Sequence, residues 1–187
     1  MEILDVVDEN NNLTGRTEDR QIVHRDGLWH REVGIWIMNE EGKLLIQKRS
    51  ALKKQAPNKW CITAGHIDAG EEPVEVVKRE TFEELGLELK NDDIEFLFII
   101  KKSKKHSETQ YNNNFQYIYF TKTNKKISEY TIQKEELSEL KYITIDELEE
   151  VAQNQNEEYT FSRSEYFSKL IEILRKKGDL KLWEEKL

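Results

Sequence analysis

The chain has 187 residues, and 37 acidic against 29 basic residues give it a net charge of −8 at neutral pH. This length fits one domain, and an acidic chain is poorly suited to nucleic acid or anionic membranes, so neither is expected as a partner. The single cysteine, Cys61, excludes an internal disulfide framework. The N-terminal residues lack the pattern of a secretory signal, and the longest apolar run, 96–100, is too short to span a bilayer. We therefore expect a cytoplasmic globular protein.

Apolar alternation and turn-forming clusters predict strands at residues 2–8, 28–38, 43–48, 59–63, 94–101, 115–121 and 140–144. Helical patterns predict helices at residues 17–26, 73–85, 147–153 and 163–177. Asp146 is the expected cap of the third helix, and residues 102–106 are expected to form a loop. Because the strands come in pairs with few helices between them, the sequence predicts an α/β fold with a mixed sheet covered by helices.

No linker rich in Pro, Ser or Gly divides the sequence, so we predict a single domain over residues 1–187. Its core is expected at 28–155, with an N-terminal strand and turn at 1–27 and a C-terminal helical extension at 156–187. The apolar stripe of helix 163–177 is expected to pack on the sheet, and a homodimer interface is the alternative.

The strongest chemical signal is the helix at 73–85, with the loop that precedes it. At about 100° per residue, Glu80, Glu83 and Glu84 fall on one face of this helix. Val77 and Leu85 fall on a neighbouring face that can pack on the sheet. Like charges at these spacings repel each other, and a divalent cation reverses the sign of that interaction. Mg²⁺ prefers carboxylate oxygens and bridges to phosphates, so we predict metal-assisted hydrolysis of a phosphoanhydride. A solvated acidic helix face is the alternative.

The wider pattern resembles the signature of the Nudix hydrolases. Its matching positions are Gly65, Glu71, Arg79, Glu80, Glu83, Glu84 and Gly86. Thr81 stands where this family usually has an aliphatic residue. The resemblance implies an α/β/α sandwich and a substrate in which a nucleoside diphosphate is linked to another group. It also implies Mg²⁺ or Mn²⁺ on the three glutamates and on the carbonyl near Gly65.

The same resemblance implies further roles in catalysis. Arg79 has an orienting role in such a site, although an ion pair with Glu75 within the helix is the alternative. The water-activating base is either a motif glutamate such as Glu83 or a later acid. The later candidates are Glu135 and Glu136, for which the alternative is a pair of solvated loop acids. Lys48 and Arg49 precede the motif and are candidates for contacts to the substrate phosphates.

Residues 2–121 resemble the isopentenyl-diphosphate-isomerase-like branch of this superfamily. The resemblance rests on segments 5–9, 14–16, 44–50 and 60–66, and on three histidines, His24, His30 and His66. It implies that these histidines hold a second metal, and three imidazoles suit zinc or manganese. A surface or hydrogen-bonded role is the alternative for each histidine.

Two departures argue against isomerase chemistry. The isomerase has a cysteine immediately before its Gly-His pair, where this chain has Ala64. It also needs glutamates where this chain has Asn112, Asn113 and Asn114, and an amide cannot deliver a proton as a carboxylic acid does. We therefore expect hydrolase chemistry on an isomerase-like scaffold, with isopentenyl diphosphate isomerisation and a non-catalytic nucleotide-binding regulator as the alternatives.

Overall fold

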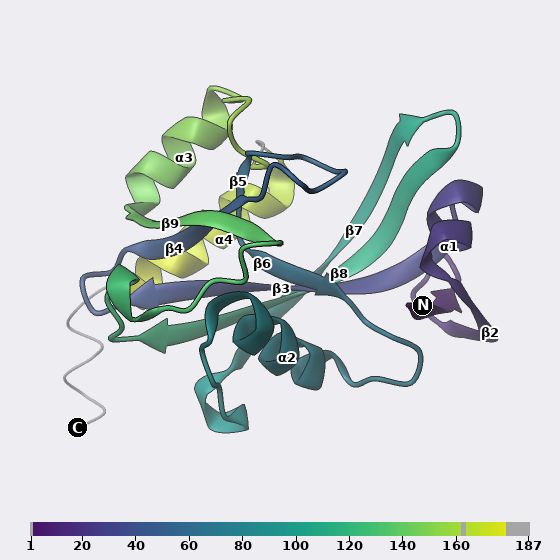
Figure 1. The fold of residues 1–187 in the computed structure, drawn as a ribbon, viewed down its shortest axis with the longest axis horizontal. Helices are drawn as coiled ribbons and strands as arrows, with labels where there is room; N and C mark the ends of the chain where they lie inside the picture. Colours follow the sequence, from purple (N-terminus) through teal and green to yellow (C-terminus); the bar gives the residue numbers. More distant parts are fainter. Residues whose placement is uncertain (1, 162–163, 179–187) are drawn as a thin grey trace. The chain divides into compact units, whose positions relative to one another are not determined.

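The computed structural model describes residues 2–161 and 164–178 of the chain, which form nine strands and four α-helices (Figure 1). The strands are β1 (Ile3–Val7), β2 (Leu13–Asp19), β3 (Trp29–Asn39), β4 (Leu44–Arg49), β5 (Trp60–Cys61), β6 (Thr63–His66), β7 (Glu95–Ser107), β8 (Gln110–Thr123) and β9 (Leu137–Ile143). The helices are α1 (Arg20–Asp26), α2 (Pro73–Leu85), α3 (Ile145–Gln153) and α4 (Glu165–Gly178), with two short 3-10 helices, η1 (Asn91–Asp93) and η2 (Ile127–Glu129). The predicted mixed α/β fold is confirmed.

Helix α2 has the bounds that the sequence predicts, because both of its ends carry strong signals. Pro73 opens the helix, where its fixed φ and missing N–H cost nothing. Gly86 follows the last residue with φ of 62°, and its N–H donates to the Phe82 carbonyl at 2.8 Å. A Cβ at residue 86 would also meet Thr131 at 3.1 Å. Glycine is therefore favoured here by both conformation and space.

The predicted loop at 102–106 is wrong, because β7 continues through it to Ser107. In this hairpin Lys102 lies opposite Asn114, and Lys104 lies opposite Asn112. Polar residues on both strands leave no apolar alternation from which the pairing could be predicted. Backbone pairing holds the hairpin instead, helped by Lys105, whose ammonium lies 5.6 Å from the centre of the Tyr111 ring.

Two smaller differences concern the ends of helices. Residues 17–19 belong to β2 and not to the predicted helix, and Asp19 caps α1 by accepting a hydrogen bond from the Gln21 N–H. Thr144, not Asp146, caps α3. The Thr144 side chain accepts from the Glu147 N–H at 3.1 Å, while the Glu147 carboxylate accepts from the Thr144 N–H at 2.6 Å. This reciprocal pair of hydrogen bonds satisfies two backbone N–H groups at once. A cap at Asp146, two residues later, would not provide this reciprocal pair.

The described residues cluster into two compact units. The first comprises Met1–Ile35, Ala64–Glu80 and Leu89–Phe120. Within it β1 pairs antiparallel with β2 and with the start of β3, β6 pairs with β3, and β8 pairs with β3 and β7. Helix α1 lies beside β1 and β2 (Figure 1), where Val23 joins a small core with Leu4 and Val6. These pairings bring α1, β3 and β6 into one unit.

The second unit comprises Trp36–Thr63, Thr81–Glu88 and the described residues from Thr121 onward. Within it β4 pairs antiparallel with the end of β3, with β5 and with β9. Arg175 of α4 donates to Asp146 and Glu149 of α3 at 2.9 and 2.6 Å. Leu148 of α3 and Leu174 of α4 are fully buried, so the apolar stripe of α4 packs inside this unit.

In the part of the chain that the structure describes, no helix is long and apolar enough to cross a membrane.

Replacing the α3 cap, in Thr144→Ala, should lower the free energy of unfolding by about 1 kcal/mol, because the Glu147 N–H loses its acceptor. Glu147→Gln keeps an acceptor for the Thr144 N–H and should cost less. Urea unfolding of the three proteins measures both values. Equal stability of Thr144→Ala and the parent would show that the cap contributes nothing.

Candidate functional site

Glu80 lies directly against the backbone of Gly65 in the first unit. Gly65 belongs to β6, and Glu80 belongs to α2. A Cβ placed on residue 65 would lie 2.2 Å from both Cδ and Oε1 of Glu80. Side-chain atoms do not approach each other so closely, so any residue larger than glycine would displace the Glu80 carboxylate. The structure therefore gives a physical reason for the glycine: it lets a carboxylate reach the main chain.

Arg79 holds this carboxylate in place. Its Nη1 donates to Glu80 Oε1 at 2.8 Å, and its Nη2 donates to Glu71 Oε2 at 3.1 Å. Glu71 also accepts from the Asp68 N–H at 3.2 Å, so the loop before α2 is tied to the helix. Burial alone would lower the pKa of Arg79, but the Glu71 and Glu80 carboxylates raise it. The alternative partner Glu75 pairs instead with Lys78, at 2.6 Å.

Glu84 is held by a different network, in the second unit. The side chain is buried, and its Oε2 accepts from Gln47 Nε2 at 2.7 Å. Thr63 Oγ1 in turn donates to Gln47 Oε1 at 2.8 Å, which fixes the orientation of the amide. Glu83, one residue earlier on the helix, is exposed. The sequence predicted both glutamates as ligands but not the buried polar chain behind Glu84.

The other predicted residues of the second unit already have partners. Lys48 pairs with Glu139 at 3.0 Å, and Arg49 Nε donates to the Gln55 carbonyl at 3.0 Å. Glu136 forms an ion pair with Lys53, whereas its neighbour Glu135 is exposed. Both basic side chains still carry further N–H groups, so they retain capacity for phosphate oxygens.

The three predicted histidines come together in the first unit. His24 lies on α1, His30 on β3 and His66 on β6, and their potential ligand atoms all lie within 4.8 Å of one another. The Nε2 atoms of His24 and His66 are 3.0 Å apart. His30 is fully buried, and its ring centre lies 4.9 Å from that of His24 and 5.3 Å from that of His66. Residues distant in sequence thus form one cluster of imidazoles.

A fourth side chain, Glu32, belongs to this cluster. Its Oε1 lies 3.5 Å from His30 Nε2 and 3.4 Å from His66 Nε2. Burial acts to raise the pKa of Glu32, but the interactions with His30, His66 and Lys102 together outweigh that effect and hold the pKa well below its usual range. Burial lowers the pKa of His66 to about 3 and also lowers that of His24. At neutral pH the cluster therefore offers the Glu32 carboxylate and neutral imidazoles at His24 and His66.

The two sets of donors suit different ions. The carboxylates of α2 are hard oxygen donors, the kind that Mg²⁺ and Mn²⁺ prefer. Imidazole nitrogens suit zinc and related transition metals. Of the two sets, the histidines are the one whose ligand atoms the structure brings together, within 4.8 Å of one another.

The environment of Cys61 does not make its thiol reactive. It is buried in β5 in the second unit, and burial raises the pKa of its thiol to about 12. At neutral pH it is protonated and is a poor nucleophile. Neither Cys61 nor Ala64 therefore supplies the cysteine chemistry of the isomerase-like alternative.

Sequence reasoning missed Glu32 and Gln47. Glu32 follows His30 by two residues on β3, so alternation places both side chains on one face of the strand, and this spacing was a usable signal. Gln47 is a polar residue in the otherwise apolar centre of β4, where a buried amide needs partners. Its partner on α2 has no local signal in the sequence.

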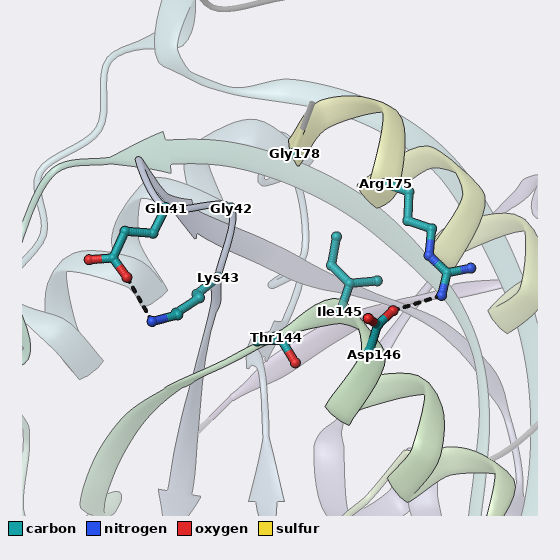
Figure 2. A pocket seen from close by; sticks show the side chains of 8 residues that line it. All are labelled: Glu41, Gly42, Lys43, Thr144, Ile145, Asp146, Arg175 and Gly178. Carbon is teal, nitrogen blue, oxygen red and sulfur yellow. Dashed lines mark hydrogen bonds and ion pairs between the residues drawn. The ribbon is translucent and has the colours of Figure 1, made fainter. Parts of the chain in front are cut away.

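A separate pocket of about 430 Å³ lies in the second unit (Figure 2). The residues that line it are Glu41, Gly42, Lys43, Thr144, Ile145, Asp146, Arg175 and Gly178. Its charges pair with one another: Lys43 with Glu41 at 2.7 Å, and Arg175 with Asp146 at 2.9 Å (Figure 2). None of the predicted site residues is among these described lining residues, and the paired charges leave little net attraction for an ion.

Comparison with known proteins adds a family match. Residues 28–164 match the model of the NUDIX domain. An uncharacterised Nudix hydrolase of Clostridium acetobutylicum is 39% identical over 151 residues, which cover 79% of this chain and 72% of that protein. Nudix hydrolase 3 of Arabidopsis thaliana is 34% identical over 182 residues, 94% of this chain but only 24% of that protein. Isopentenyl-diphosphate Delta-isomerase of Streptomyces coelicolor is 38% identical over 86 residues, 46% of this chain and 44% of that protein.

Solved structures share the fold. A crystal structure of a Deinococcus radiodurans protein has a TM-score of 0.64 at 21% identity and covers 94% of this chain and 98% of its own. The NUDIX domain of Shewanella oneidensis NrtR, solved in complex with ADP ribose, has a TM-score of 0.54 at 16% identity, covering 79% of this chain and 86% of its own. At these identities the likeness concerns the fold.

The contact between Gly65 and Glu80 can be tested by a double-mutant cycle. Gly65→Ala should lower the free energy of unfolding by about 1–3 kcal/mol, because its methyl group overlaps the carboxylate. In a Glu80→Ala background the same change should cost less, because the obstruction is gone. Denaturant unfolding of the four proteins measures the difference. An identical cost in both backgrounds would show that the two residues do not touch.

Cys61 should react with a thiol reagent such as DTNB at pH 8 far more slowly in the native protein than in urea, because burial and the raised pKa suppress the thiolate. The same reagent with the unfolded chain serves as the control. Rapid native labelling would contradict the burial of Cys61.

Proposed function

Because the chain belongs to the Nudix hydrolase family, we propose that it is a divalent-metal-dependent hydrolase of a nucleoside diphosphate linked to another moiety. The observation that carries this proposal is the Glu80 carboxylate, which lies against the Gly65 backbone and is held there by Arg79. A carboxylate fixed beside the main chain is a ready-made arrangement of oxygen donors.

The glutamates of α2, Glu80, Glu83 and Glu84, would hold Mg²⁺ or Mn²⁺ together with the Gly65 carbonyl. Such an ion, when bound, neutralises charge that develops on the phosphoryl oxygens. Arg79 keeps Glu80 oriented, and Gln47 does the same for Glu84 through its 2.7 Å hydrogen bond. The chain thus uses a part-buried and a buried polar contact to position two carboxylates, which a merely solvated helix face does not require.

The reaction is a displacement at phosphorus. The oxygen of water bonds to one phosphorus, the bridging phosphorus–oxygen bond breaks, and two phosphate monoesters leave. Lys48 and Arg49 would contact the phosphate oxygens through the N–H groups not used by Glu139 and Gln55. The water proton passes to a carboxylate base. The candidates for this base are Glu83, which is exposed, and the later acids Glu135 and Glu136.

His24, His30 and His66 would hold a second metal. This part of the proposal is supported by the convergence of their ligand atoms within 4.8 Å. The histidine cluster is also what favours the second candidate function, isomerisation of isopentenyl diphosphate. The buried Cys61, Ala64 and the amides at 112–114 argue against that reaction, since they provide neither the thiol nor the acid that it needs.

A nucleotide-binding regulator without turnover is the third candidate. NrtR carries a NUDIX domain that binds ADP ribose, so the fold alone does not decide between binding and catalysis. The intact glutamates of α2 favour catalysis. A small diphosphate is the expected ligand in either case, while the homodimer and the cytoplasmic location remain predictions from the sequence.

The experiment is a hydrolysis assay with ADP ribose and related nucleoside diphosphate compounds, in Mg²⁺, in Mn²⁺ and in EDTA. Glu84→Gln keeps the size and the Gln47 contact but loses the charge, so we expect kcat/KM to fall about 10²-fold or more. Thermal unfolding should change little.

Glu75→Gln is the matched control, because Glu75 is an exposed residue of the same helix and forms a surface ion pair with Lys78. It should retain activity. Full activity in Glu84→Gln, or turnover that EDTA does not reduce, would overturn the metal assignment. Formation of dimethylallyl diphosphate from isopentenyl diphosphate would favour the isomerase instead.

A further inference from the structure

The orientation of each histidine in the cluster is set by an acceptor at its Nδ1. His24 Nδ1 lies 2.8 Å from the Tyr111 carbonyl, and His30 Nδ1 lies 3.3 Å from the Leu28 carbonyl. His66 Nδ1 lies 3.4 Å from the Glu2 carboxylate. An oxygen at Nδ1 favours the tautomer with the proton on that nitrogen, which leaves a lone pair on Nε2. For His24 the Nε2 lone pair then points into the cluster. His30 and His66 have an oxygen near each ring nitrogen, and their Nε2 atoms both face Glu32 Oε1, at 3.5 and 3.4 Å.

These nitrogens are not satisfied by protein donors. His30 Nε2 is buried and makes no hydrogen bond to any residue that the structure describes, although Glu32 Oε1 lies 3.5 Å away. The Nε2 atoms of His24 and His66 lie 3.0 Å apart. With both protons on Nδ1 their lone pairs would repel, and only a proton on one Nε2 makes this contact a hydrogen bond. A cation between these nitrogens would remove both problems.

Glu32 is the carboxylate at this centre. Its Oε1 lies within 3.5 Å of Nε2 of both His30 and His66, and Asn112 Nδ2 donates to the same oxygen at 3.3 Å. Strand β8, which runs beside β3, offers only amides at 112–114. Asn112 Oδ1 is itself buried without a hydrogen-bond partner among the described residues. The negative charge therefore comes from β3, in the residue two positions after His30.

We propose that Glu32 is the anionic ligand of the histidine cluster, which then binds a transition-metal dication through three imidazoles and one carboxylate. This inference rests on the proposed second metal and specifies its donor set. Three nitrogens and one oxygen suit Zn²⁺, Co²⁺ or Mn²⁺ better than Mg²⁺. Asn112 is a positioning residue, because it holds the Glu32 oxygen and reaches the ion only through it.

The test is metal binding by the full chain, without any activity measurement. The protein is treated with chelator, dialysed and titrated with Co²⁺ while its visible absorption is recorded, and Zn²⁺ affinity follows from competition. We expect one tightly bound Co²⁺, displaced by Zn²⁺ and not by a large excess of Mg²⁺. Glu32→Gln should weaken binding about 10²-fold and shift the absorption bands, and Glu32→Asp should recover part of the loss.

His30→Gln should remove the Co²⁺ signal, and Glu108→Gln, on the exposed tip of the β7–β8 hairpin, should leave it unchanged. Melting curves of the metal-free variants show whether each one folds, and binding is compared only among folded variants. Wild-type affinity and spectrum in folded Glu32→Gln would overturn the role of Glu32. No Co²⁺ binding by the parent chain would overturn the site itself.

The proposed hydrolysis is tested separately by its own variant, Glu84→Gln. A chain that hydrolyses its substrate in Mg²⁺ but binds no Co²⁺ would refute this inference alone. A chain that binds Co²⁺ through Glu32 but hydrolyses nothing would refute the proposed function alone.

Discussion

The close approach of a carboxylate to a main chain is the constraint on which the candidate site depends. Glu80 can lie against residue 65 only because that residue has no Cβ, which would otherwise sit 2.2 Å from the carboxylate. A carboxylate in this position is part-buried, so its charge needs compensation. Arg79 supplies part of it, and its second contact to Glu71 ties the preceding loop to the helix. The positions of the motif are thus coupled. Gly65 leaves space for the Glu80 carboxylate, and Arg79 holds that carboxylate in place.

The chain uses two unlike ways to prepare donors for a cation. On α2, charged oxygens are restrained by donors: a guanidinium for Glu80 and a buried amide for Glu84. In the histidine cluster, neutral nitrogens are oriented by acceptors that bind the opposite side of each ring. A hydrogen-bond donor holds a carboxylate in place while the carboxylate keeps further lone pairs for an ion. An acceptor at Nδ1 holds an imidazole in place and leaves the lone pair of Nε2 for an ion. These contrasting surroundings argue that the two places are built for different metals.

Much of this fold could be predicted from the sequence, because its signals are local. Pro73 and Gly86 bound helix α2 correctly, and apolar alternation located β1, β3 and β4, whereas β2 and β6 were not predicted as strands. The hairpin of β7 and β8 was cut short because its outer half is polar on both strands, and pairing between polar strands is specified by backbone geometry alone. Gln47 and Glu32 were missed for a related reason. Each is recognisable only by a partner far away in sequence, Glu84 for the first and the His66 ring for the second.

The positions of the acidic side chains, more than the fold, distinguish hydrolase chemistry from isomerase chemistry in this chain. Isomerase chemistry requires a thiol before the Gly-His pair and acids on the strand that is β8 here, and this chain has Ala64 and the amides at 112–114 in those places. An amide has nearly the size of a carboxylate but neither its charge nor its proton, so the strand keeps its shape and loses the acid. Glu32 returns one negative charge to the same cluster from β3, where it faces two histidines and no carboxylic acid is needed to deliver a proton. A charge moved in this way preserves affinity for a dication while removing proton-transfer chemistry. The histidine cluster of this chain is consequently better suited to hold an ion than to isomerise an alkene, and the proposed function assigns the bond-breaking step to the glutamates of α2.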